Sequence, residues 1–69
     1  MKISARNFLE GKIKEVSKGA TTAHVEIELK GGEIVISSIT NEAVKELGLK
    51  KGIQAYAVIK ASDVMIAIK

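Results

Sequence analysis

The clearest pattern in the chain is a strict alternation of apolar and polar side chains over residues 22–29. Every second position there is apolar, namely Ala23, Val25, Ile27 and Leu29. A period of two predicts a β-strand with one buried face and one wet face. Adjacent glycines at 31 and 32 follow, and glycines tolerate the positive φ of tight hairpin turns. Residues 34–39, which are β-branched and apolar on both parities, are therefore predicted to be the returning strand.

Residues 8–16 show the weaker pattern of a bent strand. Leu9 and Ile13 are at odd-numbered positions and would lie on one face of a regular strand, whereas Val16 is at an even-numbered position and would lie on the other. This change of face indicates a bulge near Lys14–Glu15. Gly11 inside the run fits a tightly bent strand or a close backbone contact. We therefore predict a first strand that bends along its length.

The segment after residue 39 has the features of a short helix. Thr40 or Asn41 can cap the free N–H groups of a first turn. Apolar residues recur at helical spacing over 43–47, and Gly48 fits the position just after a helix end. A helix of about two turns is too short to be stable without packing against the rest of the protein.

Residues 53–59 and 64–68 are predicted to be the fourth and fifth strands. Both are apolar on both parities, which suggests a second buried surface, most simply a subunit interface. Five strands with one short helix between the third and fourth is the order of the OB-fold. The sequence thus predicts an all-β, OB-like five-stranded Greek-key barrel in a single domain, residues 1–69.

Composition narrows the function classes. The chain has 69 residues, 46% of them hydrophobic, and a chain this small gains burial by forming oligomers. It has no cysteine and one histidine, His24, which argues against disulfides and protein-ligated transition metals. We find no signal-peptide pattern and no run of membrane-spanning length, so we expect a soluble cytoplasmic protein with no membrane partner. The net charge of +3 is compatible with anionic partners but does not identify one.

Two short stretches carry candidate chemistry. Ser4–Arg6 places a hydroxyl beside a guanidinium just before the first strand, and Lys60–Ser62 places an ammonium beside a hydroxyl between the last two strands. Taken alone, the first fits a solvated N-terminal tail and the second an ordinary polar loop. Together with Thr40 they supply cations, hydroxyls and backbone N–H groups, a set that suits a dianion held by hydrogen bonds.

These stretches resemble the molbindins, the small molybdenum-pterin-binding (Mop) proteins. The resemblance rests on Ile3–Asn7, Ile39–Thr40 and Val58–Ile66, and it extends over essentially the whole chain. It implies a homohexamer, a trimer of dimers, that binds molybdate or tungstate between subunits for intracellular storage or homeostasis. By match to the family motif, the oxyanion-binding residues would be Ser4, the Ala5 backbone, Arg6, Thr40, Lys60, the Ala61 backbone and Ser62.

The resemblance also implies further anion sites near symmetry axes. Lys18, Gly19 and Ala20 form a turn that offers N–H groups and a charge for such a site. We interpret His24 as an exposed strand residue rather than a ligand. A pterin pocket would need aromatic residues that this chain lacks, so the expected ligand is molybdate or tungstate, with no catalytic cofactor and no directly coordinated metal.

The donor set itself favours a fully deprotonated dianion. Hydrogen phosphate must donate a proton, and a pocket of donors leaves that proton without a partner at a cost of about 1–3 kcal/mol if buried. Sulfate has no such proton, so only cavity size separates it from molybdate. Asp63 would repel an anion if it pointed inward, and we expect it to bond the local backbone or a neighbouring cation instead.

Other function classes have less support. The sequence has no Ser–His–acid constellation, no glycine-rich phosphate loop and no paired carboxylates at a recognisable site, and we predict that the protein is not an enzyme. The main alternative is an OB-fold domain that binds single-stranded nucleic acid. Such domains stack bases on aromatic residues, for which Phe8 and Tyr56 are the candidates, and the charges are mixed rather than striped. A purely structural assembly module is the third possibility.

Overall fold

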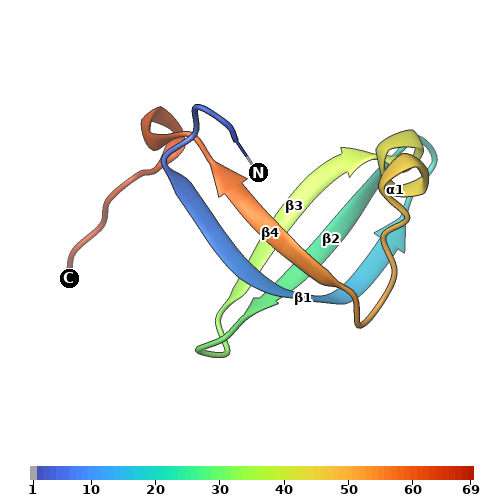
Figure 1. The fold of residues 1–69 in the computed structure, drawn as a ribbon, viewed down its shortest axis with the longest axis horizontal. Helices are drawn as coiled ribbons and strands as arrows, with labels where there is room; N and C mark the ends of the chain where they lie inside the picture. The colour runs from blue at the N-terminus through green and yellow to red at the C-terminus, as the bar shows by residue number, and fades with distance from the viewer. Residues whose placement is uncertain (1) are drawn as a thin grey trace.

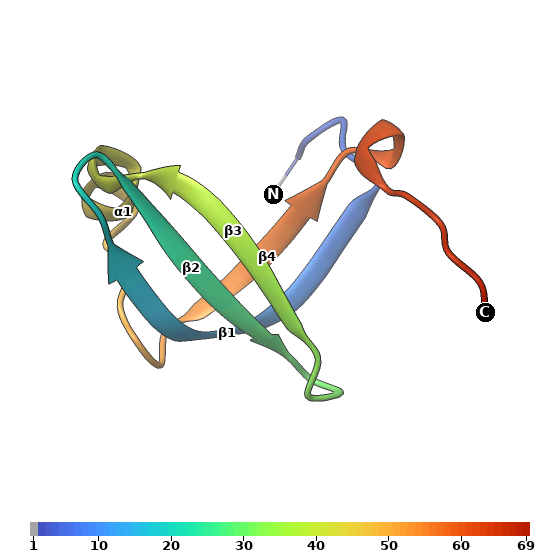
Figure 2. The same cartoon turned by 180° about the vertical axis from the view of Figure 1, so that it is seen from behind.

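The computed structural model describes residues 2–69 and shows one strongly curled antiparallel sheet with a short helix at one end (Figure 1). The strands are arranged in the order β3-β2-β1-β4, and Figure 2 shows the same curl from behind. The all-β prediction is confirmed. The elements are β1 (Asn7–Lys18), β2 (Thr22–Leu29), β3 (Ile34–Thr40), α1 (Asn41–Leu47), β4 (Gln54–Ile59) and the single-turn 3-10 helix η1 (Ala61–Asp63).

Strand β1 carries the curl because it pairs with two neighbours along its length. Residues 7–12 pair with β4, and residues 11–18 pair with β2. The β1–β2 register shifts between Ile13 and Glu15, so the predicted bulge is confirmed. Gly11 lies where the two ladders overlap, and a Cβ added there would be 2.3 Å from the Glu28 carbonyl oxygen. The predicted close backbone contact at Gly11 is therefore also confirmed.

The core lies on the concave face of the sheet. The alternation over β2 places its apolar residues inward, and the buried set comprises Ile13, Ala23, Val25, Ile27, Val44 and Ala57. Helix α1 joins this core through Val44. Its ends follow the sequence prediction: the Thr40 hydroxyl oxygen accepts from the Ala43 N–H at 3.0 Å, and Gly48 ends the helix with φ 65°. Capping fixes a helix that is too short to be stable alone.

The predicted fifth strand is not formed. Residues 64–68 follow η1 as an extended segment that leaves the sheet (Figure 1), so the sheet has four strands and its barrel is open. Backbone bonds from Asp63 N–H to the Lys60 carbonyl and from Val64 N–H to the Ala61 carbonyl turn the chain outward. A segment that is apolar on both faces needs cover on both sides, and its own chain provides none here.

We predict that Gly11→Ala destabilises the fold through a steric clash of the new methyl group with the β2 backbone. Overpacking of this kind costs about 1–3 kcal/mol in the free energy of unfolding, measurable by urea denaturation. Gly31→Ala is the matched control, because a Cβ there meets only the flexible end of Glu33. Equal stability of the two variants would contradict the role assigned to Gly11.

Candidate functional site

The two donor stretches lie side by side at one end of the sheet. Asn7 at the start of β1 pairs with Ile59 at the end of β4, and the Asn7 side-chain amide donates to the Ile59 carbonyl at 3.1 Å. Residues 4–6 and 60–62 directly flank this pair. Figures 1 and 2 show the N-terminal segment next to η1, at the end of the molecule opposite α1. The Asn7 side chain thus connects the start of β1 to the end of β4.

The local geometry turns the polar groups outward. Ala5 is buried at 8% exposure, whereas Ser4 and Arg6 on either side of it are exposed. Lys60, Ala61 and Ser62 are also exposed. The first N–H groups of a helical turn have no acceptor within that turn, and η1 begins at Ala61. This end of the sheet therefore presents two cations, two hydroxyls and backbone donors.

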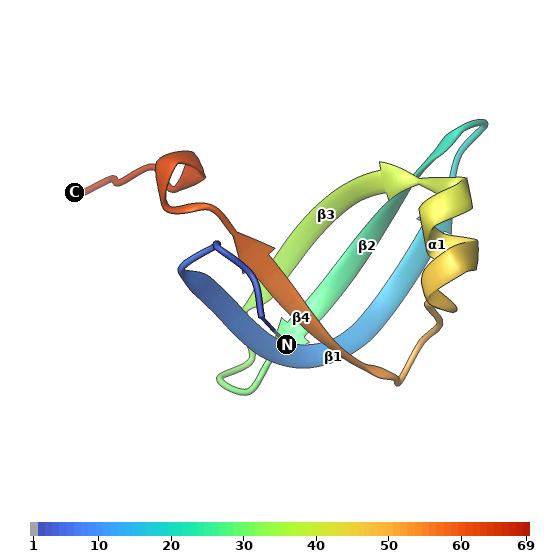
Figure 3. The ribbon, with the colours of Figure 1, turned by 45° about the horizontal axis from the view of Figure 1, so that its top comes forward.

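Thr40 lies at the other end of the molecule. Thr40 ends β3, where it pairs with Thr22, and caps α1. Helix α1 lies at the end of the molecule opposite η1 (Figure 3), and the longest extent of the molecule is 35 Å. The Thr40 hydroxyl oxygen accepts from the Ala43 N–H, which leaves its proton free to donate. The structure therefore brings together six of the seven candidate residues within one chain and separates Thr40 from them.

Thr40 instead adjoins the second candidate turn, Lys18–Ala20. The Asn41 side-chain amide donates to the Gly19 carbonyl at 3.0 Å, and the Asn41 N–H donates to the Thr21 carbonyl at 2.9 Å. Lys18, Gly19 and Ala20 are all exposed. The Gly19 N–H donates to the Thr22 carbonyl at 2.7 Å and so is not free for a ligand. This corner holds the Lys18 cation and the hydroxyls of Thr21, Thr22 and Thr40.

Two further residues from the sequence analysis can be placed. His24 is exposed on β2, between Ser17 and Ser38 of the neighbouring strands, as expected. The Asp63 carboxylate is also exposed, and within residues 2–69 it has no hydrogen bond or ion pair; only its backbone N–H bonds to Lys60. The prediction that the Asp63 side chain bonds the local backbone or a neighbouring cation is therefore wrong for the single chain.

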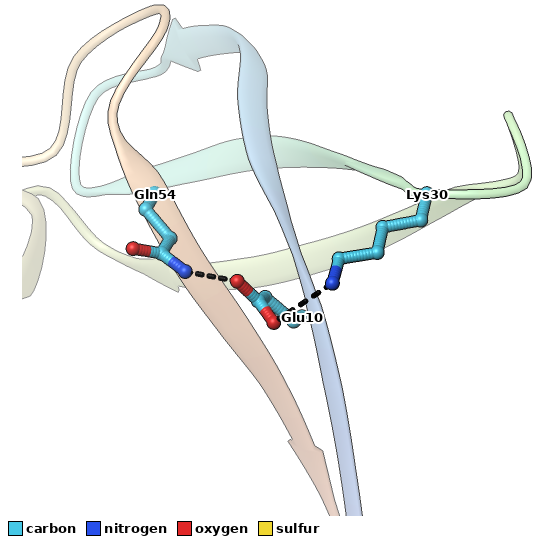
Figure 4. A network of polar contacts seen from close by, with 3 residues as sticks. All are labelled: Glu10, Lys30 and Gln54. Carbon is cyan, nitrogen blue, oxygen red and sulfur yellow. Dashed lines mark hydrogen bonds and ion pairs between the residues drawn. The ribbon is translucent and has the colours of Figure 1, made fainter.

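A polar network that the sequence did not reveal lies midway along the sheet. The Glu10 carboxylate accepts from Gln54 of β4 and forms an ion pair with Lys30 at 3.3 Å (Figure 4). With Lys12 and Glu28 these residues border a surface hollow of about 410 Å³. The Lys30 side chain is 78% exposed, so the ion pair contributes little stability. The contact depends on cross-strand register, which local sequence does not encode.

The two aromatic residues are closer in space than in sequence. Pairing of β1 with β4 places Phe8 opposite Val58 and Tyr56 opposite Glu10, so both rings lie on one face of neighbouring strands. Both are roughly half exposed. A nucleic-acid groove needs a positive track beside its stacking residues, and here the immediate neighbours of the rings are an aliphatic and an acidic side chain.

Comparisons with known proteins agree on one family. Residues 3–66 match the TOBE domain. The chain is 46% identical over 69 residues, the full length of both proteins, to the probable molybdenum-pterin-binding protein of Haemophilus influenzae. It superposes on MopII of Clostridium pasteurianum with a TM-score of 0.91 at 46% identity, covering 97% of this chain and 100% of that one.

A second similar protein has been solved with molybdate bound. The chain matches ModG, a cytoplasmic molybdate-binding protein determined with molybdate bound, with a TM-score of 0.91 at 51% identity. The match covers 94% of this chain and 46% of ModG. These similarities confirm the OB-like fold class that the sequence predicted. No helix within residues 2–69 is long and apolar enough to cross a membrane.

We predict that Asn7→Ala loosens the junction between the two donor stretches. Loss of the amide donor to Ile59 should cost about 1 kcal/mol in the free energy of unfolding. It should also speed hydrogen exchange at the amides of residues 4–6 and 60–62, as measured by mass spectrometry. Gln54→Ala, which removes an exposed side-chain bond between the same two strands, is the control. Unchanged exchange at these amides in Asn7→Ala would contradict the role given to Asn7.

Proposed function

The chain belongs to the Mop (molybdenum-pterin-binding) proteins of the TOBE-domain family, and we propose that it binds molybdate without catalysing a reaction. The observation that carries this proposal is the adjacency of residues 4–6 and 60–62 across the Asn7–Ile59 pair. Arg6 and Lys60 compensate a double negative charge, and Ser4, Ser62 and the amides of Ala5 and Ala61 donate to the oxygens.

We propose further that each site is completed by a second copy of the chain. Thr40 belongs to the family motif but lies at the opposite end of the same molecule, so a site that includes it must use the Thr40 of another subunit. The predicted homohexamer, a trimer of dimers, supplies such neighbours. The turn of Lys18, Gly19 and Ala20 is proposed as a second anion site beside that corner.

The proposed ligand class follows from the donors. Molybdate and tungstate are fully deprotonated at neutral pH, so every oxygen accepts and none donates. Hydrogen phosphate would leave its own proton unpaired, at about 1–3 kcal/mol if buried. In this proposal Asp63 stays outside the pocket, because an inward carboxylate would repel the anion. The cellular role proposed is cytoplasmic storage and homeostasis of molybdenum, and of tungsten where tungstate is the available anion.

We predict that Arg6→Ala abolishes molybdate binding and leaves the assembly folded. Arginine donates from a rigid planar fork, and its loss removes charge and hydrogen bonds from a site where charged bonds contribute about 1.5–3 kcal/mol each. Isothermal calorimetry with molybdate, repeated with tungstate, sulfate and phosphate as competitors, measures this effect.

Lys51→Ala is the control for Arg6→Ala, because it removes the same charge from an exposed turn outside the donor stretches. It should bind molybdate as the parent protein does. Retained affinity in Arg6→Ala, or equal loss in both variants, would rule out the proposed site.

We predict that the protein is an oligomer in solution. The apolar residues Phe8, Tyr56 and Val58 are each at least 40% exposed on the outer face of β1 and β4, and an apolar patch of this kind marks a protein contact. Multi-angle light scattering at micromolar concentration should give a mass well above the 7.4 kDa of one chain. A stable monomer would contradict sites shared between subunits.

A further inference from the structure

Asn41, the first residue of α1, joins that helix to the turn between β1 and β2. Its side-chain amide donates to the Gly19 carbonyl at 3.0 Å, and its backbone N–H donates to the Thr21 carbonyl at 2.9 Å. Residues 19–21 connect the two strands beside the start of the helix (Figures 1 and 3). One residue therefore fixes this turn at two points.

The same residue directly follows Thr40 in the chain. On its other side Thr40 is held by the β2–β3 ladder, where it pairs with Thr22. The Thr40 hydroxyl oxygen accepts from the Ala43 N–H, and a hydroxyl has only one proton to donate to a ligand. The position from which it donates is set by the backbone, which the ladder fixes before Thr40 and Asn41 fixes after it.

The junction of β3 with α1 needs this support. Strand β3 is an edge strand that pairs only with β2, and α1 has seven residues, too few to be stable without contacts to the rest of the protein. Val44, the buried residue of this helix, lies three residues beyond Asn41. The start of the helix is thus held largely by polar contacts, namely the Thr40 cap and the two bonds of Asn41.

The hydrogen-bond donor of the Asn41 amide is the part that the fold uses. Its Oδ1 atom is buried and accepts no hydrogen bond within residues 2–69, although buried polar atoms in proteins are almost always paired. The opposite orientation of the amide would place Oδ1 against the Gly19 carbonyl oxygen, so that two acceptors would meet. The structure therefore keeps the bond to Gly19 even though the other end of the amide is left unpaired.

We propose that Asn41 is a positioning residue for Thr40 in molybdate binding. The proposal rests on the proposed function, in which Thr40 of one copy completes the site of another. Asn41 does not bind the anion itself, because its side-chain amide is directed to the β1–β2 turn of its own chain. It fixes the β3–α1 junction, and with it the place from which the Thr40 hydroxyl donates.

A double-mutant cycle on molybdate affinity tests this role. Asn41→Ala should weaken molybdate binding about three- to tenfold, the effect of losing one hydrogen bond of ordinary strength. In a Thr40→Val background the same substitution should have no further effect, because the hydroxyl that Asn41 positions is already absent. Substitutions that act through one contact are non-additive, whereas a general structural defect would lower the affinity by the same factor in both backgrounds.

Isothermal calorimetry on the full-length protein measures the affinities, and urea denaturation without molybdate measures the stability of each variant. Asn41→Ser is a second variant, because serine has a helix propensity similar to that of asparagine but a side chain one bond shorter. It should weaken binding as Asn41→Ala does. Glu46→Gln, an exposed position on the same helix, is the control and should bind molybdate as the parent protein does.

The failure of this proposal is distinguishable from failure of the proposed function. A parent protein that does not bind molybdate would reject both. If the parent binds, unchanged affinity in both Asn41 variants would reject the role of Asn41 and leave molybdate binding standing. An equal loss of affinity in the parent and Thr40→Val backgrounds would do the same.

Discussion

The pairing of β1 with β4 is the constraint on which the candidate site depends. The two strands are separated by most of the sequence, yet their ladder ends at Asn7 and Ile59, next to the two stretches that carry cations and hydroxyls. A side-chain bond from Asn7 closes that end. The ladder in turn depends on Gly11, where β1 changes from one partner strand to the other against the backbone of β2. A glycine without chemistry of its own therefore helps to set where the stretches that contain Arg6 and Lys60 adjoin.

The second constraint is the small size of the chain. Its buried core consists of a few aliphatic residues and alanines, while many large apolar side chains remain exposed. The two edge strands of the open barrel, β3 and β4, leave backbone N–H and C=O groups unpaired, and its exposed apolar side chains lack a packing partner. In the proposed oligomer, association between copies would address both deficits together, and it would bring a distant residue such as Thr40 toward the donors that it does not reach within one chain.

The features that sequence predicted well are those encoded locally. The alternation over β2, the Thr40 cap, Gly48 at the helix end and the bulge after Ile13 each depend on a few neighbouring residues, and the structure confirms each of them. The Glu10 network and the approach of Phe8 to Tyr56 depend on the register between distant strands, which no local pattern encodes. The prediction of a fifth strand failed for another reason. Its composition indicated burial on two faces, whereas in the single chain Met65, Ile66 and Ile68 are exposed; composition does not say which chain would provide the cover.

Residues 60–62, which carry candidate anion donors, and the C-terminal segment, residues 64–68, are continuous in the chain. Residues 60–63 form the turn that both presents Lys60 and Ser62 and directs the following residues away from the molecule. A change in the direction of this turn would move the donors and the exposed apolar segment together. In the proposed site, an anion bound by Arg6 and Lys60 would contact this turn directly. The position of the proposed anion ligands and the direction of the C-terminal segment therefore depend on the same three-residue turn.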